Sequence, residues 1–345
     1  MIAVVTGSTG FIGSHLVDAL VARGATVRAL VRPESRVPTR DPRVSYVTAD
    51  LLDDRSVRES PVWDDATHVF HLAGVTKRRT LAQFRHGNVV PTANILAAIA
   101  ARGARVRRLV LVSSQAAAGP ANSADRPVRE DDPSRPIEAY GSSKLEAEQA
   151  AARYAATVPI TIVRPSAVYG PRDVDFLNVF KQATNRVAVY AAPRDQVMSI
   201  VHVRDLVNAL WLVADAPASH DRTYFVGSSA PVSWRELYVA IANISGTRSV
   251  EVQLPATVLR MAGRAGSAAS FITGRQLLIN AQKVALAAPS WWLCDSSRIR
   301  SEIGWTPDVE LHDGLRETYA WYLSAGWLRA KPRAQPATVQ RGDGA

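Results

Sequence analysis

The first thirteen residues of the chain constrain its fold more strongly than any other segment. Residues 2–5 form a short apolar run that predicts a buried strand, and three glycines follow it at intervals of three: Gly7, Gly10 and Gly13. An apolar-periodic helix is expected at residues 11–23. A strand, a glycine-rich turn and a helix N-terminus together present backbone N–H groups to a pyrophosphate, and glycine allows its close approach. This order of elements therefore predicts dinucleotide binding.

Strands and helices alternate through the first half of the chain. Apolar runs predict further strands at residues 27–31, 44–48, 68–72, 109–113 and 160–163, and helical patterns are found at residues 89–102 and 140–157. Such alternation predicts an α/β fold with a doubly wound parallel sheet and right-handed crossovers. Sheets of this kind bind ligands at the carboxyl ends of their strands.

The regular alternation ends after Gly170, where loops and many of the tryptophans begin. A strand at residues 199–203 and a helix at 205–214 are expected to return to the sheet, which makes the second domain discontinuous. The predicted division is 1–170 with 199–226 for the dinucleotide-binding domain, 171–198 with 227–328 for a smaller substrate domain, and 329–345 for a disordered tail. The polar, proline-rich loop at 122–136 fits either a lid over the site or a solvated connector.

Composition excludes several classes of protein. The 345 residues suffice for a full core, and no apolar run approaches the roughly 18 residues of a membrane span. Cys294 is the only cysteine, and no signal sequence precedes the first strand, so a cytoplasmic protein is expected. The net charge of +10 comes mainly from arginines spread along the chain, so nucleic acid is not expected as a partner. Because no run is long enough to span a bilayer, no membrane partner is expected either. His68, His71 and His86 lack metal-ligand spacing, so no metal is expected.

Three polar side chains are candidates for acid–base chemistry. Tyr140 and Lys144 are four residues apart and therefore share one face of the expected helix. A neighbouring ammonium stabilises a phenolate, so Lys144 is expected to lower the pKa of Tyr140 and suit it to proton transfer. Ser114 follows an apolar strand and can donate a hydrogen bond to a substrate oxygen in the ligand crevice.

Eight motifs occur in order between residues 1 and 325: Thr6-Gly-Ser-Thr-Gly-Phe-Ile-Gly13, Asp50-Leu51, His71-Leu-Ala-Gly74, Ser113-Ser114, Tyr140-x-x-x-Lys144, Arg164-Pro-Ser-Ala-Val-Tyr-Gly-Pro171, His202-Val-Arg-Asp205 and Glu302-Ile-Gly-Trp-Thr-Pro307. Together they make the chain resemble an extended short-chain dehydrogenase/reductase. This Rossmann-type family includes nucleotide-sugar epimerases, dihydroflavonol reductases and related ketoreductases. The motif details are most similar to dihydroflavonol-reductase-like ketoreductases.

The resemblance implies a catalytic triad of Ser114, Tyr140 and Lys144. It also implies contacts with a nicotinamide dinucleotide at Gly7, Thr9, Gly10, Phe11, Ile12, Gly13, Arg32, Arg36, Asp50, Leu51, Leu72, Ala73, Gly74, Tyr140, Lys144 and Pro165. A homodimer is implied as well, formed through the helices at 89–102 and 140–157. Structural roles are expected for Asn88, His202, Asp205 and the buried Cys294.

The end of the second predicted strand favours NADP(H) over NAD(H). NAD-binding proteins tend to place a carboxylate there to hold the ribose 2′-hydroxyl, but this chain has Arg32 and no carboxylate until Glu34. A guanidinium is well shaped to bind a 2′-phosphate, and Arg36, or alternatively Arg40, is expected to add a second contact.

Departures from the family motifs bear on the reaction. Gln115 and Ala116 stand where the family's dehydratases carry Asp-Glu. Ala118, Met198 and Ser166 replace the Tyr, Arg and Asn usual in nucleotide-sugar epimerases. We therefore expect an NADP(H)-dependent oxidoreductase that interconverts a carbonyl and a secondary alcohol of a small-molecule substrate. The alternatives are a nucleotide-sugar epimerase with tightly bound NAD and a non-catalytic dinucleotide sensor. The Trp291-Trp292 pair and residues 271–272 fit either an apolar substrate pocket or core packing.

Overall fold

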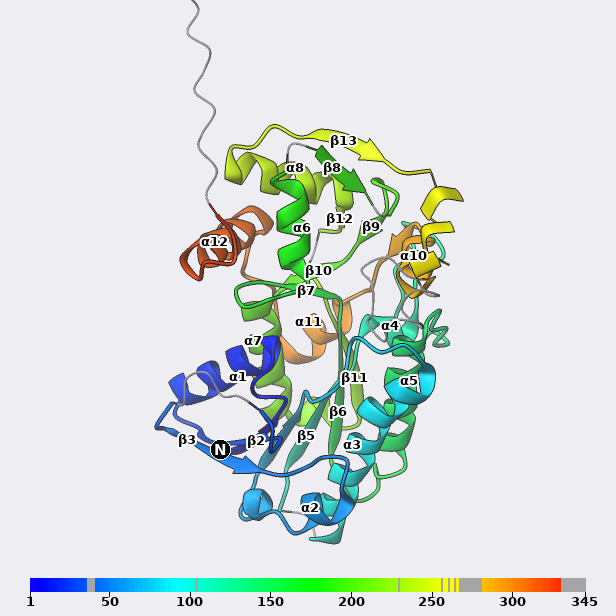
Figure 1. Cartoon of the computed structure of the whole chain (residues 1–345). Helices are drawn as coiled ribbons and strands as arrows, with labels where there is room; N and C mark the ends of the chain where they lie inside the picture. Colours follow the sequence, from blue (N-terminus) through cyan, green and yellow to red (C-terminus); the bar gives the residue numbers. More distant parts are fainter. Residues whose placement is uncertain are drawn as a thin grey trace, which may run out of the picture.

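Figure 1 shows the protein as a computed structural model. It describes residues 1–35, 41–102, 105–185, 187–190, 192–228, 230–255, 257–259, 261–263, 265–266 and 281–329. Arg36, residues 271–272 and most of the expected tail, 330–345, lie outside the described residues.

A seven-stranded parallel sheet forms the larger lobe. Its strands are β1 (Ile2–Thr6), β2 (Thr26–Val31), β3 (Val44–Thr48), β4 (His68–His71), β5 (Arg108–Val112), β6 (Ile160–Pro165) and β11 (Arg222–Val226), in the order β11-β6-β5-β4-β1-β2-β3. The predicted doubly wound α/β fold is therefore confirmed, and the ends of the predicted strands differ by at most two residues. The direction of winding reverses between β1 and β4, and the carboxyl ends of these strands border the expected ligand crevice.

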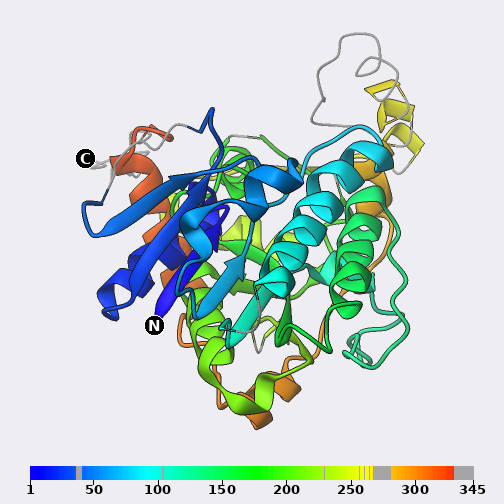
Figure 2. The ribbon, with the colours of Figure 1, turned by 90° about the horizontal axis from the view of Figure 1, so that it is seen from below.

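Helices cover both faces of this sheet (Figures 1 and 2). The elements on one face are α1 (Phe11–Ala22), α7 (Val203–Asp215) and α11 (Ser297–Ile303), and those on the other are α2 (Asp54–Arg58), the 3₁₀ turn η1 (Pro61–Trp63), α3 (Leu81–Ala101) and α5 (Ala139–Ala152). Because apolar side chains from both layers pack onto it, β1 is buried on both faces, as its uninterrupted apolar sequence predicts.

A smaller lobe is built from short strands and three longer helices. Its strand pairings are β7 (Ala167–Tyr169) with β10 (Ile200–His202), β8 (Val187–Tyr190) with β13 (Val250–Gln253), and β9 (Val197–Met198) with both β12 (Val232–Ser233) and β14 (Trp291–Trp292). The helices are α6 (Phe176–Ala183), α8 (Trp234–Ser245), α12 (Leu311–Ser324) and the short α10 (Ala281–Ala287). Tyr169, Phe180, Leu237 and Tyr322 form the centre of its core.

Two sequence-based expectations are corrected here. The strand expected at 199–203 exists as β10, but it pairs with β7 outside the main sheet, and β11 is the strand that completes that sheet. A short apolar run does not reveal which sheet it joins, because that depends on contacts distant in sequence. The second correction concerns α3, which begins at Leu81 rather than at residue 89. The remaining short elements are α4 (Gln115–Ala118) and η2 (Pro217–Ser219). Within the described ranges, no helix has the length and apolar character needed to cross a membrane.

Candidate active site

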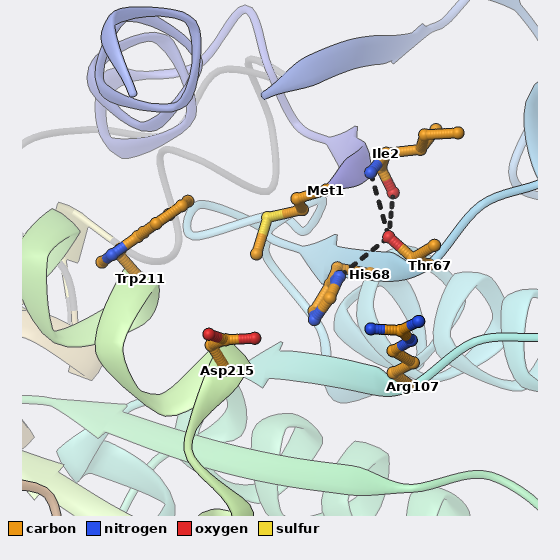
Figure 3. Close-up of a pocket in the computed structure, with 7 residues that line it drawn as sticks. All are labelled: Met1, Ile2, Thr67, His68, Arg107, Trp211 and Asp215. Carbon is orange, nitrogen blue, oxygen red and sulfur yellow. Dashed lines mark hydrogen bonds between the residues drawn. The ribbon is translucent and has the colours of Figure 1, made fainter. Parts of the chain in front are cut away.

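The larger of two described cavities, about 550 Å³, lies at the carboxyl ends of β1, β2 and β4. A second hollow of about 340 Å³ lies at the opposite, amino ends of β1 and β4 (Figure 3). In Figure 3 the Thr67 hydroxyl joins the backbone of Ile2 to the ring of His68, at distances of 2.9–3.1 Å. The ring of His68 is thus held by a hydrogen bond to Thr67 in this smaller hollow. We place the candidate site at the larger cleft.

The glycine turn forms one wall of this cleft through close backbone packing. Gly7 has a φ of +69°, and a Cβ atom there would lie 2.8 Å from the backbone of Leu72 and Ala73. A Cβ on Gly13 would lie 2.1 Å from the Gly7 carbonyl oxygen. Gly10 is the N-cap of α1 and provides no side-chain cap, so the first N–H groups of the helix are available to a ligand. The turn therefore has the tight backbone packing and the uncapped helix start that a pyrophosphate cradle requires.

Most of the predicted cofactor-binding residues line the cleft. Those that do are Gly7, Thr9, Gly10, Arg32, Asp50, Leu51, Leu72, Ala73 and Gly74. Phe11, Ile12, Gly13, Tyr140, Lys144 and Pro165 are not among its lining residues. Arg32 forms an ion pair with Glu34, with 3.4 Å between Nε and Oε1, and both side chains are exposed. The end of β2 therefore presents one cation and one carboxylate side by side.

Sequence reasoning missed the lining contributed by the segment between β4 and α3. This part of the wall consists of Val75, Thr76, Lys77, Arg78, Gln83, His86, Gly87 and Pro91. The signal was present: the Thr80 side chain accepts a hydrogen bond from the Gln83 N–H, and Gln83 reaches back to the N–H of Arg79. A Thr followed three residues later by Gln is a helix-start signature, and it would have placed the start of α3 correctly.

Ser114 and Tyr140, two members of the predicted triad, interact beside the carboxyl end of β5. Ser114 is the N-cap of α4 and accepts a hydrogen bond from the Ala116 N–H at 3.2 Å. Tyr140 is the second residue of α5. Burial raises the pKa of Tyr140 to about 12, although a hydrogen bond with the Ser114 side chain acts to lower it. The phenol is therefore protonated at neutral pH.

Lys144, the third member, is buried and fixed by the main chain. Its Nζ donates a 2.7 Å hydrogen bond to the carbonyl of Val112, the last residue of β5. Burial lowers its pKa to about 8, and the negative charge of Glu148 opposes that shift. The pKa of Tyr140 thus moves in the direction opposite to the one expected from a neighbouring ammonium, because desolvation of the phenol outweighs other influences.

Asn88 connects the triad helix to the cleft wall. Its Oδ1 accepts a hydrogen bond from the Val75 N–H at 2.7 Å. Its Nδ2 donates to the Val75 carbonyl at 3.2 Å and to the Ser143 hydroxyl, beside Lys144, at 2.8 Å. Asn88 therefore fixes the loop after β4 against α5, which is the bracing role expected for it.

His71 braces β1, β4 and α3 in a similar way. Its Nδ1 lies 2.7 Å from the Thr6 hydroxyl and its Nε2 lies 3.0 Å from the Thr92 hydroxyl. Burial lowers its pKa to about 3, so the ring is neutral and no proton is exchanged near neutral pH. Thr6 also accepts a hydrogen bond from the Ala73 N–H, which fixes the backbone of the cleft wall.

With this geometry established, comparison with known proteins identifies the family. The sequence model described as the NAD dependent epimerase/dehydratase family matches residues 3–227. The chain belongs to this family. It is 29% identical over 328 residues to the ceramide reductase of Caulobacter vibrioides, a match that covers 95% of this chain and 96% of the relative.

Two further similarities extend along nearly the whole chain. It is 30% identical to the 4-hydroxy-2-methyl-3-oxo-4-farnesyl-3,4-dihydroquinoline-1-oxide ketoreductase of Stigmatella aurantiaca, with 90% of this chain and 93% of the relative covered. The structure of MoeE5 in complex with UDP-glucuronic acid and NAD superposes with a TM-score of 0.75 at 26% identity, covering 94% and 100% of the two chains. Family and relatives indicate an enzyme of the epimerase, dehydratase or reductase type.

This member of the epimerase/dehydratase family contains a buried ion pair that sequence reasoning did not single out. Arg164, at the end of β6, donates to Glu148 of α5 through Nη2 at 2.6 Å and Nε at 3.0 Å. The Ser113 hydroxyl donates to the same carboxylate at 2.5 Å. Tyr140, Lys144 and Glu148 are spaced four residues apart along one face of α5, and that spacing could have revealed the third position.

Other residues of the family motifs have structural partners. The Asp205 carboxylate accepts hydrogen bonds from the N–H groups of Asp308 and Val309, and so fixes the segment before α12. His202 is the N-cap of α7. Cys294 is buried, and burial raises its pKa to about 12. All three therefore serve the expected structural roles.

The positions that depart from the epimerase motifs are mostly apolar and packed. Met198 is buried on β9, and Ala118 lies in a small cluster with Val128 and Cys294. Trp292 packs against the core of the smaller lobe and donates from Nε1 to the Leu286 carbonyl at 2.9 Å. For this residue, packing in the core accounts for its position.

Proposed function

We propose that this protein is an NADP(H)-dependent oxidoreductase that reduces a ketone to a secondary alcohol. The observation that carries the proposal is the hydrogen bond between Ser114 and Tyr140 beside the carboxyl end of β5, with the buried Lys144 one turn further along α5. The glycine-walled cleft lies at the same edge of the sheet. A hydroxyl, a protonated phenol and an ammonium are the groups needed to polarise a carbonyl and protonate its oxygen.

The cleft fits a dinucleotide. Residues of the glycine turn would hold the pyrophosphate, because a Cβ on Gly7 or Gly13 would collide with neighbouring backbone and close the cradle. Asp50 and Leu51 would contact the adenine, and Lys144 the nicotinamide ribose. When bound, the dinucleotide supplies a hydride to the carbonyl carbon.

The chain's own residues handle the substrate oxygen. Ser114 would donate a hydrogen bond to the carbonyl and orient it. Tyr140 would transfer its phenolic proton to the same oxygen as negative charge develops, and its pKa of about 12 keeps that proton in place at neutral pH. Lys144, cationic below its pKa of about 8, would stabilise the phenolate that remains.

The substrate class follows from the relatives and from the departures in the motifs. One relative is named as a reductase of ceramide and another as the ketoreductase of a farnesyl-bearing quinoline oxide. Ceramide and a farnesyl group both contain long hydrocarbon chains. In this chain Met198, a residue that cannot bind phosphate, stands at the arginine position typical of the family's epimerases. We therefore propose an amphiphilic ketone with a hydrocarbon tail as the substrate.

Cofactor preference is proposed from the end of β2. Arg32 lines the cleft and would bind a 2′-phosphate, and in doing so it would exchange its contact with Glu34 for a doubly charged partner. Titration of the purified protein with NADPH and NADH tests this preference directly, and tighter binding of NADH would overturn it.

Substitution Tyr140→Phe tests the mechanism. We expect the rate of ketone reduction to fall by at least about 100-fold, because a general acid contributes roughly that factor or more. Binding of NADPH, measured by its fluorescence, should change little, since the backbone of the glycine turn remains intact. Retention of near-full activity would show that Tyr140 is not the proton donor.

A second candidate, a nucleotide-sugar epimerase, is favoured by the likeness to MoeE5 solved with UDP-glucuronic acid and NAD. An epimerase of this type oxidises and re-reduces the same sugar, so it retains its cofactor. Denaturing the purified protein and identifying any released dinucleotide separates the two functions. Stoichiometric NAD would support the epimerase, whereas little retained cofactor and tighter NADPH binding would support the reductase.

A further inference from the structure

The smaller lobe exposes an apolar face where side chains would ordinarily be polar. In the parallel pair β8–β13, Val187 is in register with Val250 and Val189 with Val252. Because side chains alternate along a strand, these four valines share one face of the pair. The opposite face carries Ala188, which is buried. Figure 1 shows this pair at the outer end of the smaller lobe.

The exposed apolar side chains of this lobe are concentrated on this face and in the turns that follow β13. Val187 is 48% exposed, Val250 67% and Val252 37%. In the helical turns that follow β13, Val258 is 47% and Met261 73% exposed. These five are the majority of the nine large apolar side chains exposed in the described part of the chain. We call Val187, Val189, Val250, Val252, Val258 and Met261 the apolar patch. A patch of this kind on a folded protein marks an interaction surface.

The sequence that continues from β13 is basic. Between Val252 and Cys294 the sequence contains the basic residues Arg260, Arg264, Arg275 and Lys283 and no aspartate or glutamate. Arg248, two residues before the exposed Val250, is itself exposed.

Nearby carboxylates are paired with arginines. Glu251 on β13 lies 3.5 Å from Arg235, and Asp195 lies 3.8 Å from Arg194. These acidic groups do not offset the positive charge of the segment after β13.

We propose that the apolar patch docks the enzyme on the surface of an anionic lipid bilayer. Exposed valine and methionine side chains would enter the boundary between headgroups and acyl chains, while the exposed Arg248 and the chain's net charge of +10 would attract anionic headgroups. A second copy of the chain fits this surface less well, because it would bring the same positive charge to the contact. Docking of this kind needs no membrane-spanning helix.

The chain that follows the apolar patch reaches the segment after α4, the short helix that Ser114 caps. After the turns that contain Val258 and Met261, the described chain resumes at α10 and reaches β14, where the Trp291 carbonyl accepts a hydrogen bond from the Ala121 N–H at 2.9 Å. Ala121 closely follows α4, which Ser114 caps. In Figure 2 the turns after β13 stand out from the body of the molecule. A bilayer bound here would contact the lobe that also holds β14 and, through the Trp291–Ala121 hydrogen bond, the segment that follows α4.

Vesicle co-sedimentation tests the docking without cofactor or substrate. The full chain should bind vesicles of phosphatidylcholine mixed with phosphatidylglycerol at least about tenfold more tightly than vesicles of phosphatidylcholine alone, and salt should weaken the binding. Val250→Asp should lower binding to anionic vesicles about tenfold or more, because it removes apolar contact and adds a repelled charge. Met261→Asp should do the same, and it avoids any dependence on strand pairing.

Val174→Asp is the matched control. Val174 is 54% exposed but lies outside the apolar patch, at the approach to α6, so its substitution should leave vesicle binding unchanged. Binding to neither vesicle type, or equal binding by the wild type and both patch variants, would overturn the proposal. A dimer in sedimentation velocity that both patch variants dissociate, without vesicle binding, would instead show an interface between copies and would also overturn it.

The link to catalysis rests on the proposed function and is tested separately. Val250→Asp should slow reduction of a long-chain ketone embedded in anionic vesicles while leaving reduction of a short, water-soluble ketone unchanged. If the protein binds vesicles but reduces no ketone, the proposed function fails and the docking surface stands. If it reduces ketones but binds no vesicles, the docking surface fails and the proposed function stands.

Discussion

The two lobes differ in how their functional surfaces are held. Around the cleft of the larger lobe, backbone contacts and buried polar groups fix the wall: Gly7 packs against Ala73, and Asn88 joins Val75 to Ser143. The smaller lobe instead leaves valines exposed on a two-stranded pair. Chemistry that requires sub-ångström placement of reacting atoms needs rigid surroundings like those of the cleft. Contact with a fluid lipid surface does not need such rigidity.

The largest effect is expected where backbone crowding is tightest. Gly13→Ala places a Cβ 2.1 Å from the Gly7 carbonyl oxygen, so the turn must shift. We expect a loss of about 3 kcal/mol or more in the free energy of unfolding and loss of dinucleotide binding. Urea denaturation and NADPH titration measure the two effects.

Gly24→Ala separates crowding from backbone strain. Gly24 also has a positive φ, +75°, but a Cβ atom added there would have no neighbour within 4 Å. Its substitution should therefore cost only the left-handed backbone penalty of about 1–2 kcal/mol and spare dinucleotide binding. If Gly13→Ala proved no more damaging than Gly24→Ala, crowding in the turn would not be what fixes the cleft.

The buried pair between α5 and β6 is expected to give an effect of similar size to that of Gly13→Ala. Glu148 and Arg164 have side chains only 6% exposed, so Glu148→Gln leaves an uncompensated guanidinium in the core. We expect a loss of about 3–5 kcal/mol in the free energy of unfolding. Glu146→Gln is the control: Glu146 lies on the same helix, but its partner Arg85 is largely exposed, and the loss should be only a small fraction as large.

The same substitution should alter the pH dependence of activity. The charged groups around Lys144 are Glu148 on its own helix and Arg164 on β6, and the neighbouring His71 on β4 is neutral. A carboxylate stabilises the ammonium, so its removal lowers the pKa of Lys144 below its present value of about 8. The alkaline limb of kcat/KM should then move to lower pH in Glu148→Gln and stay in place in Glu146→Gln. An unmoved limb in a folded Glu148→Gln enzyme would limit Glu148 to a structural role.

The larger lobe was the easier to predict from sequence because local rules determine its features. Three of these features depend only on residues close together in the chain: the glycine turn, the apolar run of a strand buried on both faces, and the spacing of Tyr140 and Lys144. Glu148 follows the same spacing, but its partner Arg164 lies on another strand, so its burial could not be inferred from the helix alone.

The smaller lobe was harder because its features depend on pairing between distant segments. Val187–Tyr190 and Val250–Gln253 each alternate in a way that suggests one apolar face, yet only their mutual register shows that the valines coincide. Likewise β10 is apolar enough for the main sheet but pairs with β7. The division into domains, the homodimer through α3 and α5 and the cofactor preference stay predictions.

The smallest effect is expected where the two lobes meet at the cleft. Lys77, which lines the cleft, forms an ion pair with Asp175 at the start of α6, and both side chains are half exposed. A double-mutant cycle of Lys77→Met and Asp175→Asn, followed by urea denaturation, should give a coupling below about 1 kcal/mol, because water screens such pairs. A weak link at this point would let the lobes separate to admit a bulky substrate without disturbing the wall of the larger lobe. A coupling of several kcal/mol would mean that this ion pair holds the two lobes together. The smaller lobe would then be as firmly fixed at the cleft as the larger lobe is.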